Sequence, residues 1–286
     1  MLQSFWIMLA AKMTTTAIIV VAASKIVERA GPFLGAMVAT LPISAGPSYI
    51  FLAAEHGGAF IHEAALTSLA VNGVTFGFGA LYAVLARKRP LWIALGLSFG
   101  LWIVAALAVV NTRWTVGSAA LLNIAIFIPA YLATVACRAT PPGRPPMARW
   151  WDIPFRAALV MALVGFTVVV GRFFGPAAAG VAALVPIVMF SLAIILQPRI
   201  GGAGASAVLA HALPGLVGFG IAVAALHLTV LPLGAPLALA LALAICGGWN
   251  ASLALLRHMP QRRRATLTCQ DGGSTLGSTR SKANEL

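Results

Sequence analysis

The chain has 286 residues, of which 60% are hydrophobic and only 9% are charged, whereas a soluble domain carries roughly 25% charged residues. This composition excludes an ordinary soluble enzyme. The 28 Gly and 17 Pro accompany long apolar runs rather than polar repeats, which excludes a disordered or collagen-like chain. The net charge of +13 comes from Lys and Arg placed mostly between the apolar runs, so we expect it to set membrane topology rather than to bind nucleic acid.

Apolar windows along the chain predict nine membrane-spanning helices, each long enough to cross a hydrocarbon core of about 30 Å. In chain order they cover residues 5–27, 32–54, 64–86, 91–110, 115–137, 153–171, 173–196, 203–228 and 231–256. The predicted fold is therefore an all-α integral membrane protein whose main partner is the lipid bilayer.

The Lys and Arg residues between these spans predict the topology. Only Arg113 and Arg172 follow even-numbered spans, and the other basic residues follow odd-numbered ones: Lys25, Arg29, Arg87, Lys88, Arg89, Arg138, Arg144, Arg149, Arg156, Arg199 and the group that begins at Arg257. Because basic residues concentrate on the cytoplasmic side, this pattern predicts an outer N-terminus and a cytoplasmic C-terminus in a bacterial-type inner membrane.

A Pro- and Arg-rich cytoplasmic linker, residues 138–152, divides the predicted spans into two groups. Residues 1–137 hold five spans and residues 153–256 hold four. Residues 257–286 are polar and basic without apolar periodicity, so we expect them to form a disordered cytoplasmic tail.

The two groups of spans carry signs of an internal duplication. A shift of 144 residues aligns Gly31-Pro32 with Gly175-Pro176, Pro42-Ile43 with Pro186-Ile187, and Gly57-Gly58 with Gly201-Gly202, with 10 identities over 29 positions. Because the first copy has an odd number of spans, the second copy enters the membrane in the opposite orientation. Inverted repeats of this kind are typical of secondary transporters that work by alternating access.

Matching proline interruptions in the second and seventh spans indicate the candidate substrate site. Corresponding breaks in two halves free backbone groups near the bilayer midplane, where a ligand can meet them. His211 lies deep in the eighth span and is a further candidate. The candidate set comprises Thr40, Pro42, Ser44, Gly46, Pro47, Ser48, Pro186 and His211. The alternative without a binding site is that the prolines are kinks needed for helix packing and that the hydroxyls hydrogen-bond the backbone of their own helices.

Three amides inside predicted spans, Asn72, Asn123 and Asn250, are either a polar lining or interhelical hydrogen-bond partners. Three ionisable groups also need an interpretation. We expect Lys12 in the first span to extend its ammonium outward, and Glu55 and Arg199, which align across the repeats, to be solvated span ends or parts of opposite gates.

Two His and two Glu flank the turn between the second and third spans, but Glu55, His56, His62 and Glu63 match no zinc signature. The chain also lacks the nucleophile, metalloprotease and phosphate-binding motifs, and none of its carboxylates lies deep in a predicted span. We therefore expect no enzyme activity, catalytic residue, metal or cofactor.

Together these patterns favour a permease or exporter of a small anionic or neutral solute. The alternative from another class is a membrane subunit or assembly factor that binds partner helices or lipids and transports nothing. The glycine pairs at four-residue spacing indicate close helix packing. A homodimer is left open as a further partner.

Overall fold

The computed structural model describes residues 2–29, 45–139 and 149–256. Every regular element in these ranges is a helix. The elements are α1 (Leu2–Arg29), α3 (Ala45–His56), α4 (Gly58–Ala86), α5 (Leu91–Val110), α6 (Val116–Ala133), α7 (Val135–Arg138), α8 (Asp152–Ala183) and α9 (Ile187–Leu233), followed by a C-terminal helix, Ala235–Leu256. The predicted tail and most of the predicted linker lie outside the described residues.

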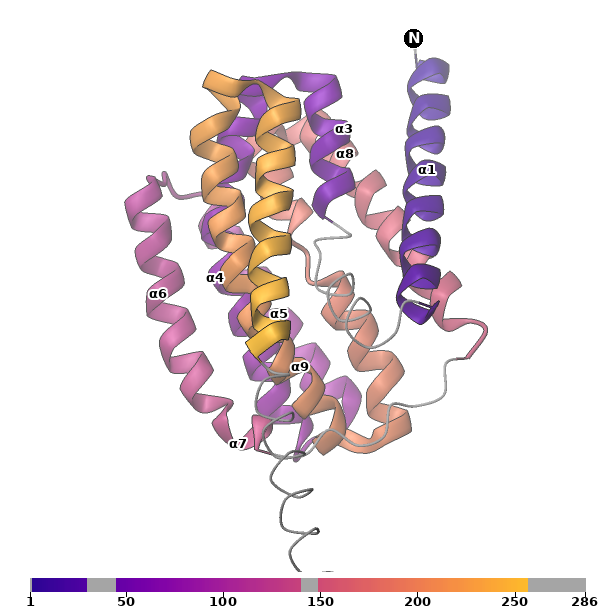
Figure 1. Cartoon of the computed structure of the whole chain (residues 1–286), viewed down its shortest axis with the longest axis vertical. Coiled ribbons are helices and arrows are strands. Elements are labelled where there is room, and N and C mark those ends of the chain that lie inside the picture. Colours follow the sequence, from indigo (N-terminus) through magenta and orange to yellow (C-terminus); the bar gives the residue numbers. More distant parts are fainter. Residues whose placement is uncertain (1, 30–44, 140–148, 257–286) are drawn as a thin grey trace, which may run out of the picture.

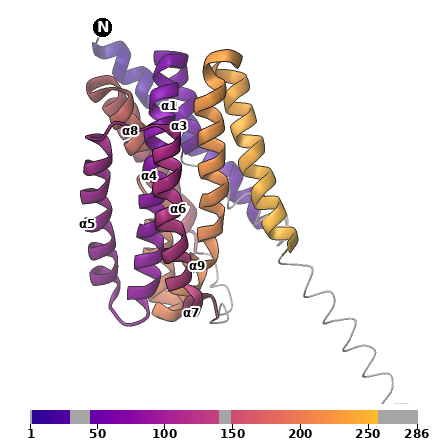
Figure 2. The same ribbon diagram turned by 90° about the vertical axis from the view of Figure 1, so that its left-hand side faces the viewer.

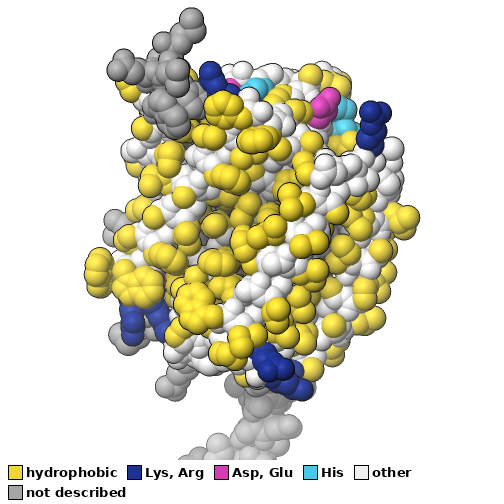
Figure 3. All heavy atoms as spheres, turned by 180° about the vertical axis from the view of Figure 1, so that it is seen from behind, with side chains coloured by type: hydrophobic (Ala, Val, Ile, Leu, Met, Phe, Trp, Pro, Cys, Tyr) yellow, Lys and Arg dark blue, Asp and Glu magenta, His cyan; other side chains and the backbone are white. Residues whose placement is uncertain are grey.

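Six of the described helices are long and apolar enough to cross a membrane: α4, α5, α6, α8, α9 and the C-terminal helix. Figure 3 shows hydrophobic side chains over the middle of one face, whereas Lys, Arg, Asp, Glu and His gather toward its two ends. This distribution suits a bilayer, whose core is apolar and whose interfaces are wet. The predicted class, a helical multi-pass membrane protein, is confirmed.

The helix boundaries agree with the sequence in some places and differ in others. The fourth predicted span, residues 91–110, coincides with α5, Leu91–Val110. The third was expected to begin at residue 64, but α4 begins at Gly58. The apolar window that predicted this span excluded His62 and Glu63. The helix nevertheless includes these polar residues at its solvent-facing end, because its backbone hydrogen bonds need no apolar side chains.

Four glycines with positive φ mark places where one helix ends and the next begins: Gly57, Gly175, Gly201 and Gly234. Two of them have nearly the same backbone angles, with φ 79° and ψ −175° at Gly57 and φ 75° and ψ 168° at Gly201. Gly175 and Gly201 lie inside α8 and α9, so each of these two elements consists of two helices joined at a kink.

Contacts with α4 show that the chain reverses direction at Gly201. Before this glycine, α9 runs along α4 in the same sense, since Met189 packs against Gly79 and Tyr82 donates a 2.6 Å hydrogen bond to Gln197. After it, α9 runs back, and its contacts with α4 proceed in the opposite order from the Ala86–Gly202 contact to the Gly58–Val230 contact. We call the two ends of the molecule the Gly57 end and the Gly201 end.

The antiparallel crossing of α4 and the second part of α9 forms the centre of the molecule. At the midpoint of α4, Asn72 Nδ2 donates a 3.0 Å hydrogen bond to the carbonyl of Leu216, which lies 144 residues further along the chain. The helices approach so closely at the Gly201 end that a Cβ on Gly202 would lie 1.9 Å from the carbonyl oxygen of Ala86. Only glycine fits there without backbone movement.

A second antiparallel pair is formed by α1 and the first part of α8. Met13 packs against Gly165, and Val20 shares a small core with Ala157 and Val160. In Figure 1, α1 lies at one edge of the molecule, and its N-terminus extends past the other helices at the Gly57 end.

The remaining helices enclose α4, which is the most buried helix, with 78% of its most apolar window buried against 11% for α6. Asn123 and Ile126 of α6 pack against Gly73 and Gly77 of α4. The C-terminal helix lies beside the second part of α9 in both ribbon views (Figure 1, Figure 2), and its Trp249 donates a 2.9 Å hydrogen bond to the carbonyl of Pro214.

Candidate functional site

The residues predicted to form the site are only partly described. Thr40, Pro42 and Ser44 lie outside the described residues. Gly46, Pro47 and Ser48 form the first turn of α3, where Pro47 and Ser48 are buried. A Cβ on Gly46 would meet nothing within 4 Å, so the backbone at this helix N-terminus has open space beside it.

Pro186 lies at a break between helices. Residues 184–186 are not helical, and Pro186 itself, with φ −74° and ψ 47°, precedes the first residue of α9. The helix before the break ends in a turn that is tighter than an α-helical turn. The amides of Leu184 and Val185 donate hydrogen bonds to the carbonyls of Val181 and Ala182, three residues earlier in the chain. Carbonyls around the break therefore need hydrogen-bond donors from elsewhere in the molecule.

Hydroxyl groups of α4 supply those partners. Thr75 Oγ1 donates a 3.1 Å hydrogen bond to the carbonyl of Leu184 and accepts a 3.0 Å hydrogen bond from the indole of Trp102 on α5. Both side chains are almost fully buried. Thr75 therefore fixes the break against α4 and α5 at once.

Two turns earlier, Ser68 makes the corresponding contact with the short helix before the break. Ser68 donates a 2.7 Å hydrogen bond to the carbonyl of Gly180 and accepts a 2.6 Å hydrogen bond from Tyr49 of α3. Gly180 lies close to α4, since a Cβ there would be 2.3 Å from the carbonyl oxygen of Ala64. The broken segment, residues 176–186, is thus hydrogen-bonded to the most buried helix at two levels.

The amide of Asn72 forms a second polar group, at the crossing of α4 and α9. Asn72 Nδ2 also donates a 3.0 Å hydrogen bond to Asn123 Oδ1, and Asn123 donates to the carbonyls of Leu69 and Ala119. Asn72 Oδ1 is buried and has no hydrogen-bond partner among the described residues. It is an acceptor held near the middle of the molecule without a donor.

Asn250 and His211 are placed differently. Asn250 lies on the C-terminal helix, where its Nδ2 donates to the carbonyl of Cys246 and its Oδ1 lies against Gly215. His211 Nδ1 lies 2.8 Å from the carbonyl oxygen of Ala207 in its own helix. Both hydrogen bonds lie within one helix, so the polar lining and the bonding between helices that the sequence left open for these residues stay predictions.

Two ion pairs correct the expectations for the charged residues. Lys12 pairs with Glu55 rather than only extending its ammonium into the interface. Arg199 makes two hydrogen bonds of 2.7 Å and 2.6 Å to the carboxylate of Asp152. Glu55 and Arg199, which align across the proposed repeats, therefore each bond the first helix of their own half, at opposite ends of the molecule.

The histidines at the Gly57 end also differ from a metal cluster. His62 and His227 stack with ring centroids 3.8 Å apart, and the Nδ1 of each lies within 2.8 Å of the other's carbonyl oxygen. His56 stacks on Phe60 instead. Among the described residues, no three His, Cys, Asp or Glu side chains are grouped as a metal site requires.

The arrangement around the break offers hydrogen-bonding groups, but the described side chains around it offer no nucleophile beside a base. It holds hydroxyl groups and an indole, and α9 begins directly after it. Sequence reasoning missed Ser68, Thr75, Tyr49 and Trp102 here. Their only signal was the seven-residue spacing of Ser68 and Thr75 within an apolar span, which places both on one helix face.

Fold and site together define a helical, multi-pass membrane protein with an interrupted helix in its interior. Comparisons with protein-family models, with curated proteins and with solved structures found no match to this chain.

Proposed function

We propose that this protein is a secondary transporter that moves a small anionic or neutral solute by alternating access between two inverted repeats. The observation that carries the proposal is the helix break at residues 184–186, which lies beside the antiparallel crossing of α4 and α9. Interrupted helices beside a repeat interface are where secondary transporters bind substrate. The proposal assigns the protein no catalytic chemistry.

Contacts between α4 and α9 support the inverted repeat. The Gly58–Val230 contact at one end and the Ala86–Gly202 contact at the other exchange under the 144-residue shift, and the hydrogen bond between Asn72 and Leu216 joins two positions related by that same shift. A pseudo-two-fold axis through this bond would produce all three contacts. An odd number of membrane crossings in the first repeat would explain why the related helices run antiparallel.

The pairing of α1 with α8 supports the same axis. The Met13–Gly165 contact corresponds under the shift to positions 157 and 21, and Ala157 shares its core with Val20 and with Val21. We infer nine membrane crossings, five before the linker and four after it, with α8 and α9 each reversing direction at their internal glycine.

The distribution of charge supports an orientation. Arg87, Lys88, Arg89, Arg138 and Arg199 belong to helix ends and turns at the Gly201 end, whereas Arg113 and Arg172 belong to the other end. The positive-inside rule then places the Gly201 end in the cytoplasm and the N-terminus outside. We propose a bacterial-type inner membrane as the location, because the composition is that of a multi-pass inner-membrane protein.

Helix N-termini near the break support the proposed substrate class. With 12 residues, α3 is too short to cross a hydrocarbon core of about 30 Å, and so is the first part of α9, which runs from Ile187 to the kink at Gly201. We therefore infer that both N-termini lie within the membrane. The N-terminus of a helix carries a partial positive charge of roughly half an elementary charge. Described carboxylates, by contrast, lie near helix ends, at Glu55, Glu63 and Asp152, so a cationic solute would lack a counter-ion.

Ligand-dependent thermal stability tests the proposal. The purified protein is heated in the presence of a panel of small metabolites, ions and pH values, since a ligand that favours the folded state raises the apparent Tm. We expect an anionic or neutral solute to raise it, and we expect Pro186→Ala and Ser48→Ala to remove the shift. Ser98→Ala, a buried serine that bonds only its own helix, is the matched control. A shift unaffected by Pro186→Ala and Ser48→Ala would contradict the site.

One observation favours a second candidate, a membrane subunit or assembly factor that transports nothing. The carbonyls of Gly180 and Leu184 are already satisfied by Ser68 and Thr75, as they would be in a rigid scaffold. This candidate would be favoured if no solute of the panel raised the apparent Tm and a partner protein co-purified stoichiometrically in mild detergent. A stable monomer or homodimer without a partner would argue against it.

A further inference from the structure

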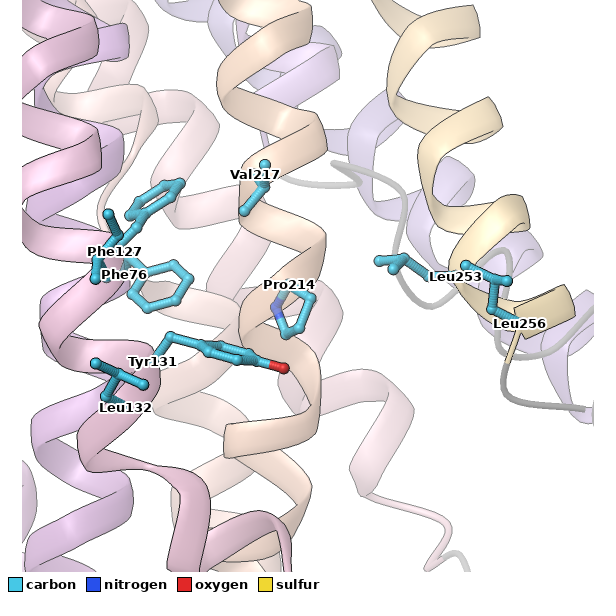
Figure 4. Close-up of a pocket in the computed structure, with 9 residues that line it drawn as sticks. Phe76, Phe127, Tyr131, Leu132, Pro214, Val217, Leu253 and Leu256 are labelled. Atoms are coloured by element: carbon cyan, nitrogen blue, oxygen red, sulfur yellow. The ribbon is translucent and has the colours of Figure 1, made fainter. Parts of the chain in front are cut away.

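An apolar groove lies between α6 and the C-terminal helix, in the half of the molecule nearer the Gly201 end. Its volume is about 510 Å³, within the range of roughly 300–1,000 Å³ typical of ligand sites. In Figure 4, the rings of Phe76 and Phe127 lie together on one side, Tyr131 extends from α6 toward Pro214, and Leu253 and Leu256 stand across the gap.

The groove opens sideways, toward the hydrocarbon layer of the membrane. It is lined by helices long and apolar enough to span a bilayer. Its rim residues Ile128, Leu132 and Leu256 have exposed fractions of 58%, 63% and 62%. The inner wall is closed, because Phe76 is only 1% exposed. A molecule in the bilayer can therefore enter this groove from the side, and the part that fills it must be apolar.

A fixed cation lies at the Gly201 end of the groove. The guanidinium of Arg138 sits 3.6 Å from the centroid of the Tyr131 ring, and Tyr131 lines the groove. Arg138 donates 2.6 Å and 2.8 Å hydrogen bonds to the Thr134 hydroxyl and to the carbonyl of Tyr131. These contacts hold the guanidinium in one orientation and leave its other N–H donors uncommitted among the described residues.

We propose that this groove binds an anionic phospholipid from the leaflet at the Gly201 end, with an acyl chain against Phe76 and Phe127 and the phosphate on Arg138. Guanidinium groups bind phosphate oxygens through paired hydrogen bonds, and basic pockets between membrane helices bind anionic headgroups. A zwitterionic lipid fits less well because its own ammonium opposes Arg138. The site rests on the membrane embedding of the helices and is independent of the proposed transport.

The test uses the full-length protein purified in detergent, titrated with phosphatidylglycerol or phosphatidylcholine of the same acyl chains, with apparent Tm as the readout. We expect phosphatidylglycerol to raise the Tm at lower concentration than phosphatidylcholine. For Arg138→Gln, the half-maximal phosphatidylglycerol concentration should rise about tenfold, which corresponds to losing one charged contact. Ile128→Trp should have a similar effect by filling the groove.

Two matched variants separate this site from general lipid effects. Arg113→Gln removes an exposed cation at the opposite end, and Leu121→Trp adds the same bulk to an exposed position of α6 that does not line the groove. Both should keep the wild-type preference for phosphatidylglycerol. Equal stabilisation of the wild type by the two lipids, or an equal loss in Arg113→Gln and Arg138→Gln, would overturn the proposal.

Discussion

At the scale of single residues, glycines define where this chain turns and how closely its helices approach. Gly57 and Gly201 combine a positive φ with a ψ near 180°, a backbone conformation that other residues reach only with strain. Gly202 has a different role, because its lack of a side chain allows α9 to contact the backbone of α4. The repeated Gly-Gly pair in the sequence indicated an internal duplication. It did not predict which glycine turns the chain and which one packs.

Substitution of Gly201 tests the turn. A Cβ there would meet nothing within 4 Å, so any loss of stability comes from the backbone conformation alone. We expect Gly201→Ala to lower the free energy of unfolding by about 1–3 kcal/mol. Gly96→Ala, at a helical glycine with equally open surroundings, should leave stability unchanged or raise it by up to about 1 kcal/mol. Thermal unfolding in detergent measures both, and equal effects would contradict the turn.

Residue-scale predictions from the sequence failed where partners are distant. Thr75 and the carbonyl of Leu184 are 109 residues apart in the chain, and Lys12 and Glu55 are 43 apart. The spacing of hydroxyls or charges along the chain does not show which distant group each of them contacts. Pro186, by contrast, was predictable as a helix break because proline lacks the amide hydrogen that a helix needs.

At the scale of elements, the interrupted segment before α9 is the feature on which the functional proposal depends. Ser68 and Thr75 of α4 donate hydrogen bonds to two of its carbonyls, and the indole of Trp102 on α5 donates to the Thr75 hydroxyl. The two ion pairs also join separate helices. The Lys12–Glu55 pair joins α1 to α3, and the Asp152–Arg199 pair joins α8 to α9, with the signs of the charges reversed between the halves.

Removing the Thr75 hydroxyl tests whether α4 holds the break. Thr75→Val keeps the shape of the side chain but leaves the Leu184 carbonyl and the Trp102 indole without their partner. We expect the free energy of unfolding to fall by about 1–3 kcal/mol, the usual cost of unsatisfied buried groups. Thr167→Val is the control, since Thr167 is fully buried but bonds only the carbonyl of Leu163 in its own helix. Similar losses in both variants would contradict the account.

At the scale of the whole molecule, composition and apolar periodicity were enough to predict a helical membrane protein and, for α5, the helix bounds themselves. Packing was not predictable, because in a uniformly apolar sequence every helix face looks similar. The antiparallel crossing at Asn72 and Leu216 became visible only in three dimensions. It joins two helices that the proposed 144-residue repeat relates.

The most direct test of alternating access is the sidedness of solvent access to the break. Ser191 is 2% exposed and lies one turn into α9 after Pro186. Ser191→Cys is introduced into a background without Cys137, Cys246 and Cys269, and sealed vesicles of each orientation are treated with a membrane-impermeant thiol reagent. Ser98→Cys, at a buried serine of α5, is the control. The account predicts that Ser191→Cys reacts from both sides and Ser98→Cys from neither. Reaction of Ser191→Cys from one side only, or from none, would contradict it.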